Sequence, residues 1–165
     1  MAKTLYLMRH AKAESPDMQR GDFDRVLNQR GVRDATEMGQ RLQKRGVKPD
    51  VILCSPSQRT RQTAELLVAE LGGTLDGVQF DDRIYEASMD ILLDLIRALP
   101  PACASAMVIG HNPSVGWLAN QLSGYQIATM PSCAVAAFEL PSFSWRDMGA
   151  GTARLLDFDY PGKAV

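Results

Sequence analysis

The chain has 165 residues, 45% of them hydrophobic and 22% charged, a balance typical of a folded domain with a sizeable core. Eighteen basic and nineteen acidic residues give a formal net charge of -1, which argues against binding to nucleic acids or other polyanions. No apolar run approaches the roughly 18 residues that a membrane-spanning helix needs, and Arg9 and His10 interrupt the first run too early for a secretory signal. We therefore expect one domain over residues 1–165, located in the cytoplasm, with no membrane partner.

The three cysteines, Cys54, Cys103 and Cys133, are odd in number, widely spaced and set among apolar neighbours. This pattern is typical of reduced thiols in a core and disfavours both a disulfide framework and a redox or metal role. We therefore predict three buried, free cysteines, as expected for a protein of a reducing compartment.

Short β-rich runs alternate with segments of helical period along the chain, which is typical of an α/β domain. Residues 4–8 are predicted to form an apolar first strand, and residues 11–27 are polar and irregular. Asn28 is expected to cap the first helix, which ends near Gly46 and has its apolar positions at Val32, Ala35, Met38 and Leu42.

The second predicted strand, residues 51–54, runs directly into a strong signal for a helix start. Ser55 is expected to cap this helix, with Pro56 at the first helical position and Gln58 completing a capping box. The two glycines at residues 72–73 are expected to end it.

The remaining predicted elements continue the alternation. Asn112 and Pro113 are typical of the cap and the first position of a helix, which would run to about residue 124. The segment 141–151, which contains Trp145, is either the edge of a crevice or an ordinary strand connection. The other predicted elements are strands at residues 78–80, 106–109, 134–140 and 153–158 and a helix at residues 88–99.

Unusual residues follow three of the predicted strands at the point where each strand ends. The first strand runs into Arg9 and His10, the second into the stretch that ends at Arg59, and the strand at 106–109 into His111. These two histidines are the only ones in the sequence. Ligands of open α/β sheets bind beyond the carboxyl ends of the strands. If the three strands are neighbours, the four side chains converge on one crevice.

Two simpler interpretations compete with a functional one. A single histidine is usually a surface residue or a satisfied polar residue, but two chance histidines directly after separate buried strands are much rarer. A metal site is the second alternative, since imidazole is a common ligand. Arg9 lies beside His10, however, no carboxylate adjoins either histidine, and no His-x-x-x-His spacing occurs. The sequence therefore favours chemistry that needs neither a metal nor a cofactor.

Two imidazoles with two guanidiniums are suited to phosphoryl transfer. Arginine side chains bind phosphate oxygens through two parallel hydrogen bonds and remain charged at any working pH. A neutral imidazole nitrogen is a competent nucleophile that can carry a covalent intermediate. The start of the helix after Ser55 would add backbone N–H donors beside Arg59, which also favour an anion. We interpret the site as one that forms a phosphohistidine on the enzyme.

Three stretches carry these side chains, at Leu7–Ala11, Ser55–Ala64 and Val108–Pro113. In content and order they resemble the motifs of the histidine phosphatase superfamily, also called the phosphoglycerate mutase-like fold. The resemblance implies a single three-layer α/β/α domain with a mostly parallel central sheet. A finer resemblance, to the small SixA-type phosphohistidine phosphatase branch, rests on Lys12, Ala13, the stretch from Asp24 to Gly31, Tyr85 and Ala87.

The resemblance also implies roles for individual residues. His10 would be the nucleophile, Arg9 and Arg59 would clamp the phosphoryl oxygens, and His111 would stabilise their charge during transfer. Arg61 is the rival of Arg59 within the second motif, but two helical positions rotate it by about 200°, to the opposite face of the helix. We expect Arg61 to be a solvated surface charge or a contact at the rim.

The general acid is the least certain role. Larger family members use a carboxylate for it, and Glu86 is the nearest candidate in sequence order, with Asp22 and Asp24 as others. A solvent-facing charge is an equally good interpretation of Glu86. An imidazole leaving group needs no strong acid, because it departs as a neutral ring once its second nitrogen is protonated, and its reference pKa is about 6.5.

The chain leaves little room for a lid. About 50 residues separate Arg59 from His111, and the predicted elements already use them. An open crevice would admit a phosphorylated side chain of a protein, such as a phosphohistidine carrier or relay domain, and would surround a small phosphorylated molecule poorly. The alternatives are a phosphomonoesterase with Glu86 as its acid and a phosphate-binding regulatory module without turnover. A monomer or weak dimer is expected.

Overall fold

The computed structural model describes residues 2–142 and 144–163. Its centre is a six-stranded sheet in the order β3-β2-β4-β1-β5-β6. The first four of these strands are parallel, and β5 and β6 add an antiparallel edge beside β1. The expected mostly parallel α/β sheet is therefore confirmed. The strands are β1 (Lys3–Arg9), β2 (Val51–Cys54), β3 (Val78–Phe80), β4 (Ser105–Gly110), β5 (Val135–Leu140) and β6 (Arg154–Asp159).

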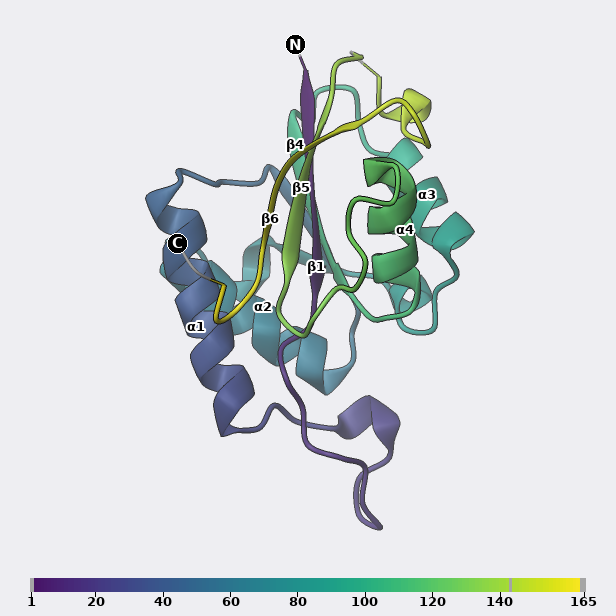
Figure 1. Cartoon of the computed structure of the whole chain (residues 1–165). Coiled ribbons are helices and arrows are strands. Elements are labelled where there is room, and N and C mark those ends of the chain that lie inside the picture. The colour runs from purple at the N-terminus through teal and green to yellow at the C-terminus, as the bar shows by residue number, and fades with distance from the viewer. Residues whose placement is uncertain (1, 143, 164–165) are drawn as a thin grey trace.

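Four helices cover the two faces of the sheet and make three layers (Figure 1). Helices α1 (Gln29–Lys44) and α2 (Gln58–Glu70) lie on one face, and α3 (Met89–Arg97) and α4 (Ser114–Ser123) on the other. Alternate residues of each central strand point to opposite faces of the sheet. Because helices cover both faces, the side chains on both sides of these strands are buried and apolar. Within β4, Val108 packs toward α3 and α4, whereas Met107 and Ile109 pack toward α1 and α2.

All six predicted strands form, and their ends lie within one residue of the predictions. The cap of the first helix is also confirmed, since the Asn28 side chain accepts a hydrogen bond from the backbone N–H of Gly31 at 2.8 Å. The three cysteines are buried and free, as predicted. Strand patterns and this cap depend on local sequence, which explains why they could be anticipated.

The predicted start of the second helix is wrong by about two residues. Helix α2 begins at Gln58 with Ser57 at the capping position, and Ser57 makes no side-chain cap hydrogen bond. Ser55 instead continues the sheet, because its backbone N–H donates to the carbonyl of Ile109 at 3.1 Å. This pairing keeps Ser55 and Pro56 out of the helix. The Ser55 hydroxyl is therefore available for a contact other than capping.

Two further positions differ from the sequence analysis. Helix α4 begins at Ser114, one residue later than predicted, although Asn112 still accepts from the N–H of Gly116 at 3.1 Å. Val32 was predicted to lie on the buried face of the first helix but is 41% exposed. Gly31 and Gly39 are buried instead, and a Cβ on Gly39 would lie 2.9 Å from the Cβ of Glu70 on α2. Close approach of the two helices through glycine explains the shift in the buried face.

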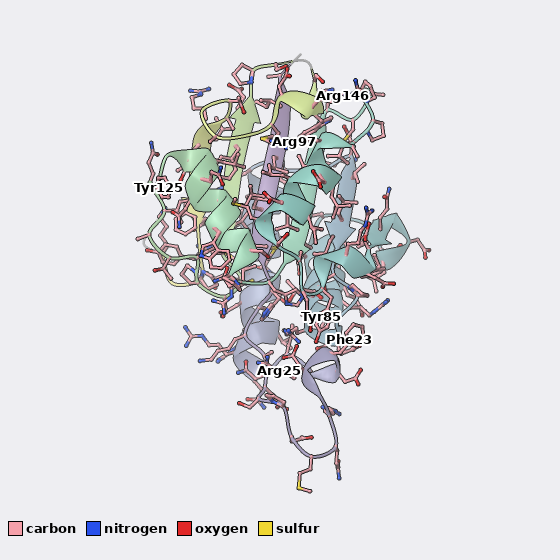
Figure 2. The ribbon with its side chains drawn as sticks, turned by 90° about the vertical axis from the view of Figure 1, so that its right-hand side faces the viewer. Phe23, Arg25, Tyr85, Arg97, Tyr125 and Arg146 are labelled. Carbon is pink, nitrogen blue, oxygen red and sulfur yellow. The ribbon has the colours of Figure 1, made fainter. Side chains whose placement is uncertain are left out.

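The described residues of the segment 141–151, all but residue 143, connect β5 with β6 and do not line the crevice described below. It contains a short helix, Trp145–Asp147, and Trp145 is buried in the core with its indole N–H donating to the Cys103 carbonyl at 2.8 Å. Figure 2 shows Arg146 at the opposite end of the molecule from Phe23 and Tyr85. None of the helices in the described part of the chain has both the length and the apolar character needed to cross a membrane.

Candidate active site

The carboxyl ends of β1, β2 and β4 meet at one edge of the sheet. Strand β4 lies between the other two, and Arg9 on β1 is in register with Gly110 on β4. His10 and His111 follow these strands directly, and their ring centroids are 5.3 Å apart. The four predicted side chains therefore do converge on one crevice of about 500 Å³. Its lining residues are Arg9, His10, Asp22, Arg25, Arg59, Tyr85, Glu86, Ala87, His111, Asn112, Pro113 and Ser114.

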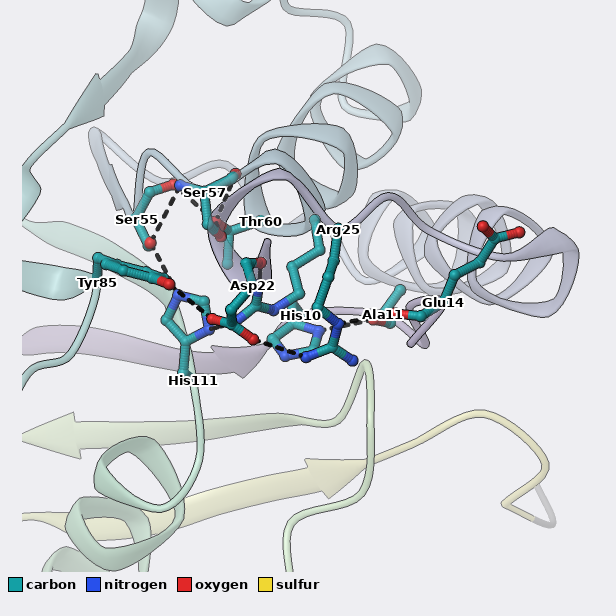
Figure 3. Close-up of polar contacts among 11 residues, drawn as sticks. His10, Ala11, Glu14, Asp22, Arg25, Ser55, Ser57, Thr60, Tyr85 and His111 are labelled. Carbon is teal, nitrogen blue, oxygen red and sulfur yellow. Dashed lines mark hydrogen bonds and ion pairs between the residues drawn. The ribbon is translucent and has the colours of Figure 1, made fainter. Parts of the chain in front are cut away.

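His10 has one ring nitrogen engaged and the other free. Its Nδ1 lies 2.7 Å from the carbonyl oxygen of Ala11, an acceptor, so Nδ1 carries the proton and Nε2 keeps its lone pair (Figure 3). Burial, with the charges of Arg59 and Arg9, lowers the pKa of His10 to about 4 despite that hydrogen bond. The ring is therefore neutral near pH 7. It is also only 8% exposed, so His10 is packed inside the crevice and does not lie at its rim.

His111 is held by one contact on each ring nitrogen. Its Nδ1 is 3.3 Å from Nη2 of Arg59, and its Nε2 is 2.8 Å from the hydroxyl oxygen of Ser55. Burial, His10 and the charge of Arg59 lower the pKa of His111 to about 3. Two neutral imidazoles thus face one crevice, which avoids the repulsion that two imidazolium ions would create.

The two predicted arginines leave donors unused inside the protein. Arg59 is only 5% exposed, and the Nε atoms of Arg59 and Arg9 are both buried without a hydrogen-bond partner among the described residues. A buried donor without a partner costs about 1–3 kcal/mol. Both residues line the crevice, and phosphate oxygens suit guanidinium geometry. Arg9 is otherwise anchored by donating from Nη1 to the Met130 carbonyl at 3.2 Å.

Arg61 lies outside the lining of the crevice. Its guanidinium stacks on the ring of Phe80, 4.1 Å from the ring centroid. The helical rotation that separates it from Arg59 therefore directs the two side chains to different surroundings. Arg61 is a cation–π partner of Phe80, a contact that our sequence analysis did not anticipate.

A loop of residues 14–25, called the strap here, closes one side of the crevice. An isolated bridge between Ala13 and Leu27 joins its two ends. The Asp22 carboxylate accepts from Tyr85 Oη at 2.6 Å, from Arg25 Nη1 at 3.0 Å and from Arg59 Nη2 at 3.1 Å (Figure 3). These hydrogen bonds hold the pKa of Asp22 well below its usual range. Asp22 is therefore ionised and cannot donate a proton in this state.

The other candidate acids have different surroundings. Asp24 is exposed and does not line the crevice. Glu86 does line it and is also exposed, with a backbone φ of 90° that residues other than glycine rarely adopt. Such strain costs of order 1–3 kcal/mol and is concentrated at functional sites. Glu86 thus lies at the crevice in a strained backbone conformation.

Several residues of the site were not predicted. Arg25, Tyr85 and Ser55 reach the crevice or its histidines through contacts between segments distant in sequence, whereas Asn112 lines the crevice because it follows His111 directly. The density of charges between residues 20 and 25 was the only signal for Arg25, and the position of Ser55 directly after a strand was the signal for that residue. In the described part of the chain, no three His, Cys, Asp or Glu side chains are grouped to hold a metal ion.

Comparison with known proteins identifies similar sequences. The model of the histidine phosphatase superfamily (branch 1) matches residues 5–98, a range that ends before His111. An uncharacterized protein of Mycobacterium tuberculosis strain H37Rv is 30% identical over 93% of this chain and 99% of its own length. An uncharacterized chloroplastic protein of Arabidopsis thaliana is 31% identical over 89% of this chain and 71% of its own.

Solved structures are similar over the whole chain. The candidate phosphohistidine phosphatase SixA of Nakamurella multipartitia superposes with a TM-score of 0.85 at 29% identity, covering 99% of this chain and 98% of that one. The corresponding SixA candidate of Agrobacterium tumefaciens has a TM-score of 0.83 at 28% identity and covers 96% and 98%. These likenesses confirm the phosphoglycerate mutase-like fold and the similarity to SixA that the sequence motifs indicated.

Proposed function

The chain belongs to the histidine phosphatase superfamily, branch 1, and on that premise we propose that it is a phosphohistidine phosphatase. In this proposal it removes the phosphoryl group from a histidine of a partner protein and carries it briefly on His10. The observation on which the proposal depends is the neutral His10 ring, its Nε2 free, in a crevice that the side chains of Arg9 and Arg59 also line. That arrangement combines a nucleophile with a binding site for the anion it attacks.

In the first step, the lone pair of His10 Nε2 forms a bond to phosphorus, and the bond from phosphorus to the substrate nitrogen breaks. The substrate ring takes the electron pair and departs as neutral imidazole if its other nitrogen is already protonated. Phosphorylated His10 then carries a positive ring charge, which the Ala11 carbonyl would stabilise through the hydrogen bond from Nδ1–H that is 2.7 Å long in the unmodified protein. Arg9, Arg59 and His111 would hold the phosphoryl oxygens during the transfer.

In the second step, water attacks phosphorus and the bond to Nε2 breaks. Nε2 recovers its electron pair, and both water protons stay on the product as dihydrogen phosphate. His10 returns to the neutral form with its proton on Nδ1. No carboxylic acid is required in either step, which agrees with an Asp22 that is ionised by its contacts.

The shape of the crevice and its relatives support a protein as substrate. The crevice is open, with the exposed side chains of Asp22, Glu86 and Pro113 at its margin. Figure 2 shows Phe23, a residue of the strap, beside Tyr85, and Met18 in the strap is fully exposed. The two SixA candidates described above are also similar over nearly their whole length, at 28% and 29% identity.

A phosphomonoesterase is the second candidate function, because Glu86 lines the same crevice in a strained backbone conformation. An alkoxide or phenolate leaving group needs a proton, and Glu86 would supply it. A phosphate-binding module without turnover is the third and weakest alternative, since such a module would have no use for the nucleophile.

The proposal is tested by measuring phosphate release from a phosphohistidine-bearing carrier protein, with para-nitrophenyl phosphate assayed in parallel. We expect a higher kcat/KM on the carrier than on the aryl ester. Turnover of the aryl ester alone would overturn the proposed substrate and favour the phosphomonoesterase. Phosphate binding without turnover of either substrate would favour the binding module.

A further inference from the structure

Ser55 is a fully buried residue beside the crevice, and the mechanism above does not use it. Its backbone is fixed on both sides. The N–H donates to the Ile109 carbonyl at 3.1 Å, and the carbonyl accepts from the hydroxyl of Thr60 at 2.7 Å. These backbone contacts place the Ser55 hydroxyl without help from its side chain. They would therefore remain if the hydroxyl were removed.

The Ser55 hydroxyl oxygen contacts the histidine that faces His10. It lies 2.8 Å from Nε2 of His111 and also accepts from the backbone N–H of Ser57 at 3.3 Å (Figure 3). Ser55 thus contacts Nε2 of His111, whereas the guanidinium of Arg59 contacts the other ring nitrogen. Its oxygen already accepts one N–H and has capacity for a second.

The contact on the other ring nitrogen decides where the proton of His111 resides. A guanidinium can only donate hydrogen bonds, so His111 Nδ1, 3.3 Å from Arg59 Nη2, must be the acceptor. The single proton of the neutral ring is then on Nε2, which donates it to Ser55 Oγ. With the opposite tautomer, Nδ1–H and the Arg59 N–H would point at each other.

We propose that Ser55 is a positioning residue for His111, which holds the ring by accepting its Nε2 proton and thereby directs Nδ1 toward the phosphoryl group. This inference rests on the proposed function of the crevice. When a phosphoryl group enters, Nδ1 can donate a hydrogen bond to it only after taking up a proton. Ser55 Oγ accepts from Nε2–H in the neutral and in the protonated ring alike. The hydroxyl therefore stabilises the protonated ring in the orientation that transfer needs.

Other titratable and charged groups around His111 also affect the protonation of its ring. His10, Arg59 and Arg25 oppose a positive charge on the ring, and the Asp22 carboxylate favours it. Tyr85 meets the ring edge-on, at a centroid distance of 5.6 Å. None of these groups contacts Nε2, so the Nε2 contact is the one contact of the His111 ring that removal of the Ser55 hydroxyl changes.

The experiment compares Ser55→Ala with Ser57→Ala. Ser57 is an equally buried serine two residues away, and its hydroxyl contacts Thr60 at 2.6 Å instead of a histidine. We expect Ser55→Ala to lower kcat on the phosphohistidine carrier about 10- to 100-fold with KM changed less than threefold, as for a lost contact that strengthens in the transition state. We expect Ser57→Ala to stay within threefold of wild type. Equal losses in the two variants would overturn the proposal.

A second readout does not depend on turnover. Imidazole ¹⁵N spectra of the wild type at pH 7 should show His111 protonated at Nε2, and added inorganic phosphate should protonate Nδ1 as well. Ser55→Ala should keep the proton on Nε2, because Arg59 still donates to Nδ1, but should lose the hydrogen-bonded chemical shift of Nε2–H and the response to phosphate. A wild-type ring protonated at Nδ1, or an unchanged response in Ser55→Ala, would overturn the proposal. If the carrier is not a substrate, these spectra and turnover of the aryl ester still test the role of Ser55. A failure of the proposed function is therefore distinguishable from a failure of the proposal about Ser55.

Discussion

His10 and His111 face each other at a ring-centroid distance of 5.3 Å, although they follow the first and fourth strands of the chain. The parallel pairing of β1 with β4 brings them together, because Arg9 and Gly110, the residues just before them, are in register. His10 is buried and His111 is partly buried, both near Arg59, and both have a lowered pKa. The crevice therefore offers two neutral bases and three guanidinium groups, of Arg9, Arg25 and Arg59, to a phosphoryl group.

The two arginines of the second motif should differ sharply in activity. Arg59→Ala removes a buried guanidinium from the crevice, and we expect kcat/KM to fall by about 2–3 orders of magnitude. Arg61→Ala removes only the contact with Phe80, which costs about 0.5–1 kcal/mol of stability and little activity. Phosphate-release kinetics and thermal unfolding of both variants check this prediction. Equal losses of activity would show that Arg59 has no special role.

The sequence predicted the parts of this site that depend on local pattern. Apolar runs set the strands, and polar residues directly after them identified Arg9, His10, Arg59 and His111 as neighbours in space. Adjacent parallel strands place their carboxyl ends together, so the convergence needed only the assumption that these strands are paired. The site residues on strand ends were predictable for that reason.

The rest of the site depends on contacts that no local pattern encodes. The strap reaches Arg59 through Asp22, and Tyr85 joins them from a third segment. The capping box at Ser55 had the expected residue types, yet pairing of Ser55 with Ile109 in the sheet prevailed over the local helix signal. Tertiary hydrogen bonds of this kind override propensities of a few tenths of a kcal/mol.

The two histidines should make stability depend on pH. Their pKa values in the folded protein, about 4 for His10 and about 3 for His111, lie below the unfolded value of about 6.5. Between the folded and unfolded pKa values, the unfolded chain therefore binds more protons than the folded protein. The free energy of unfolding consequently decreases as pH falls from about 6.5 toward 4. Chemical denaturation across this range measures the effect.

The protonation state of the two histidines can also be checked directly, and a double variant serves as the control for the stability measurement. Neither histidine should titrate between pH 5.5 and 8 in an NMR titration of the folded protein. The double variant His10→Asn with His111→Asn should lose most of the pH dependence of stability. A histidine that titrates near pH 6.5 in the native protein would contradict the assignment of two neutral rings.

Glu86 distinguishes the two candidate reactions. We expect Glu86→Gln to leave turnover of the phosphohistidine carrier within about threefold of wild type, because a protonated imidazole leaves without an acid. Glu65→Gln is a matched control, since Glu65 is also exposed but does not line the crevice. A loss of 100-fold or more on the carrier in Glu86→Gln alone would assign the acid to Glu86.

Phe23 should matter for a protein substrate more than for a small one. Its ring is 41% exposed beside the crevice and packs edge-on against Tyr85 at a centroid distance of 5.0 Å. We expect Phe23→Ala to lower kcat/KM on the carrier about 5- to 10-fold, the cost of losing about 1 kcal/mol of contact with a partner, and to leave the aryl ester unchanged. Leu156→Ala, at an exposed leucine on β6, is the control. Equal effects on both substrates would argue against a docking role.

The central claim is that the phosphoryl group passes through His10. The most direct measurement is a rapid-quench experiment with a carrier protein radiolabelled on its phosphohistidine, followed by peptide mapping under alkaline conditions that preserve phosphohistidine. We predict transient label on the peptide that contains His10, and none in His10→Asn, whose turnover should fall by about 1,000-fold or more. Label on another residue, or full turnover in His10→Asn, would contradict the account.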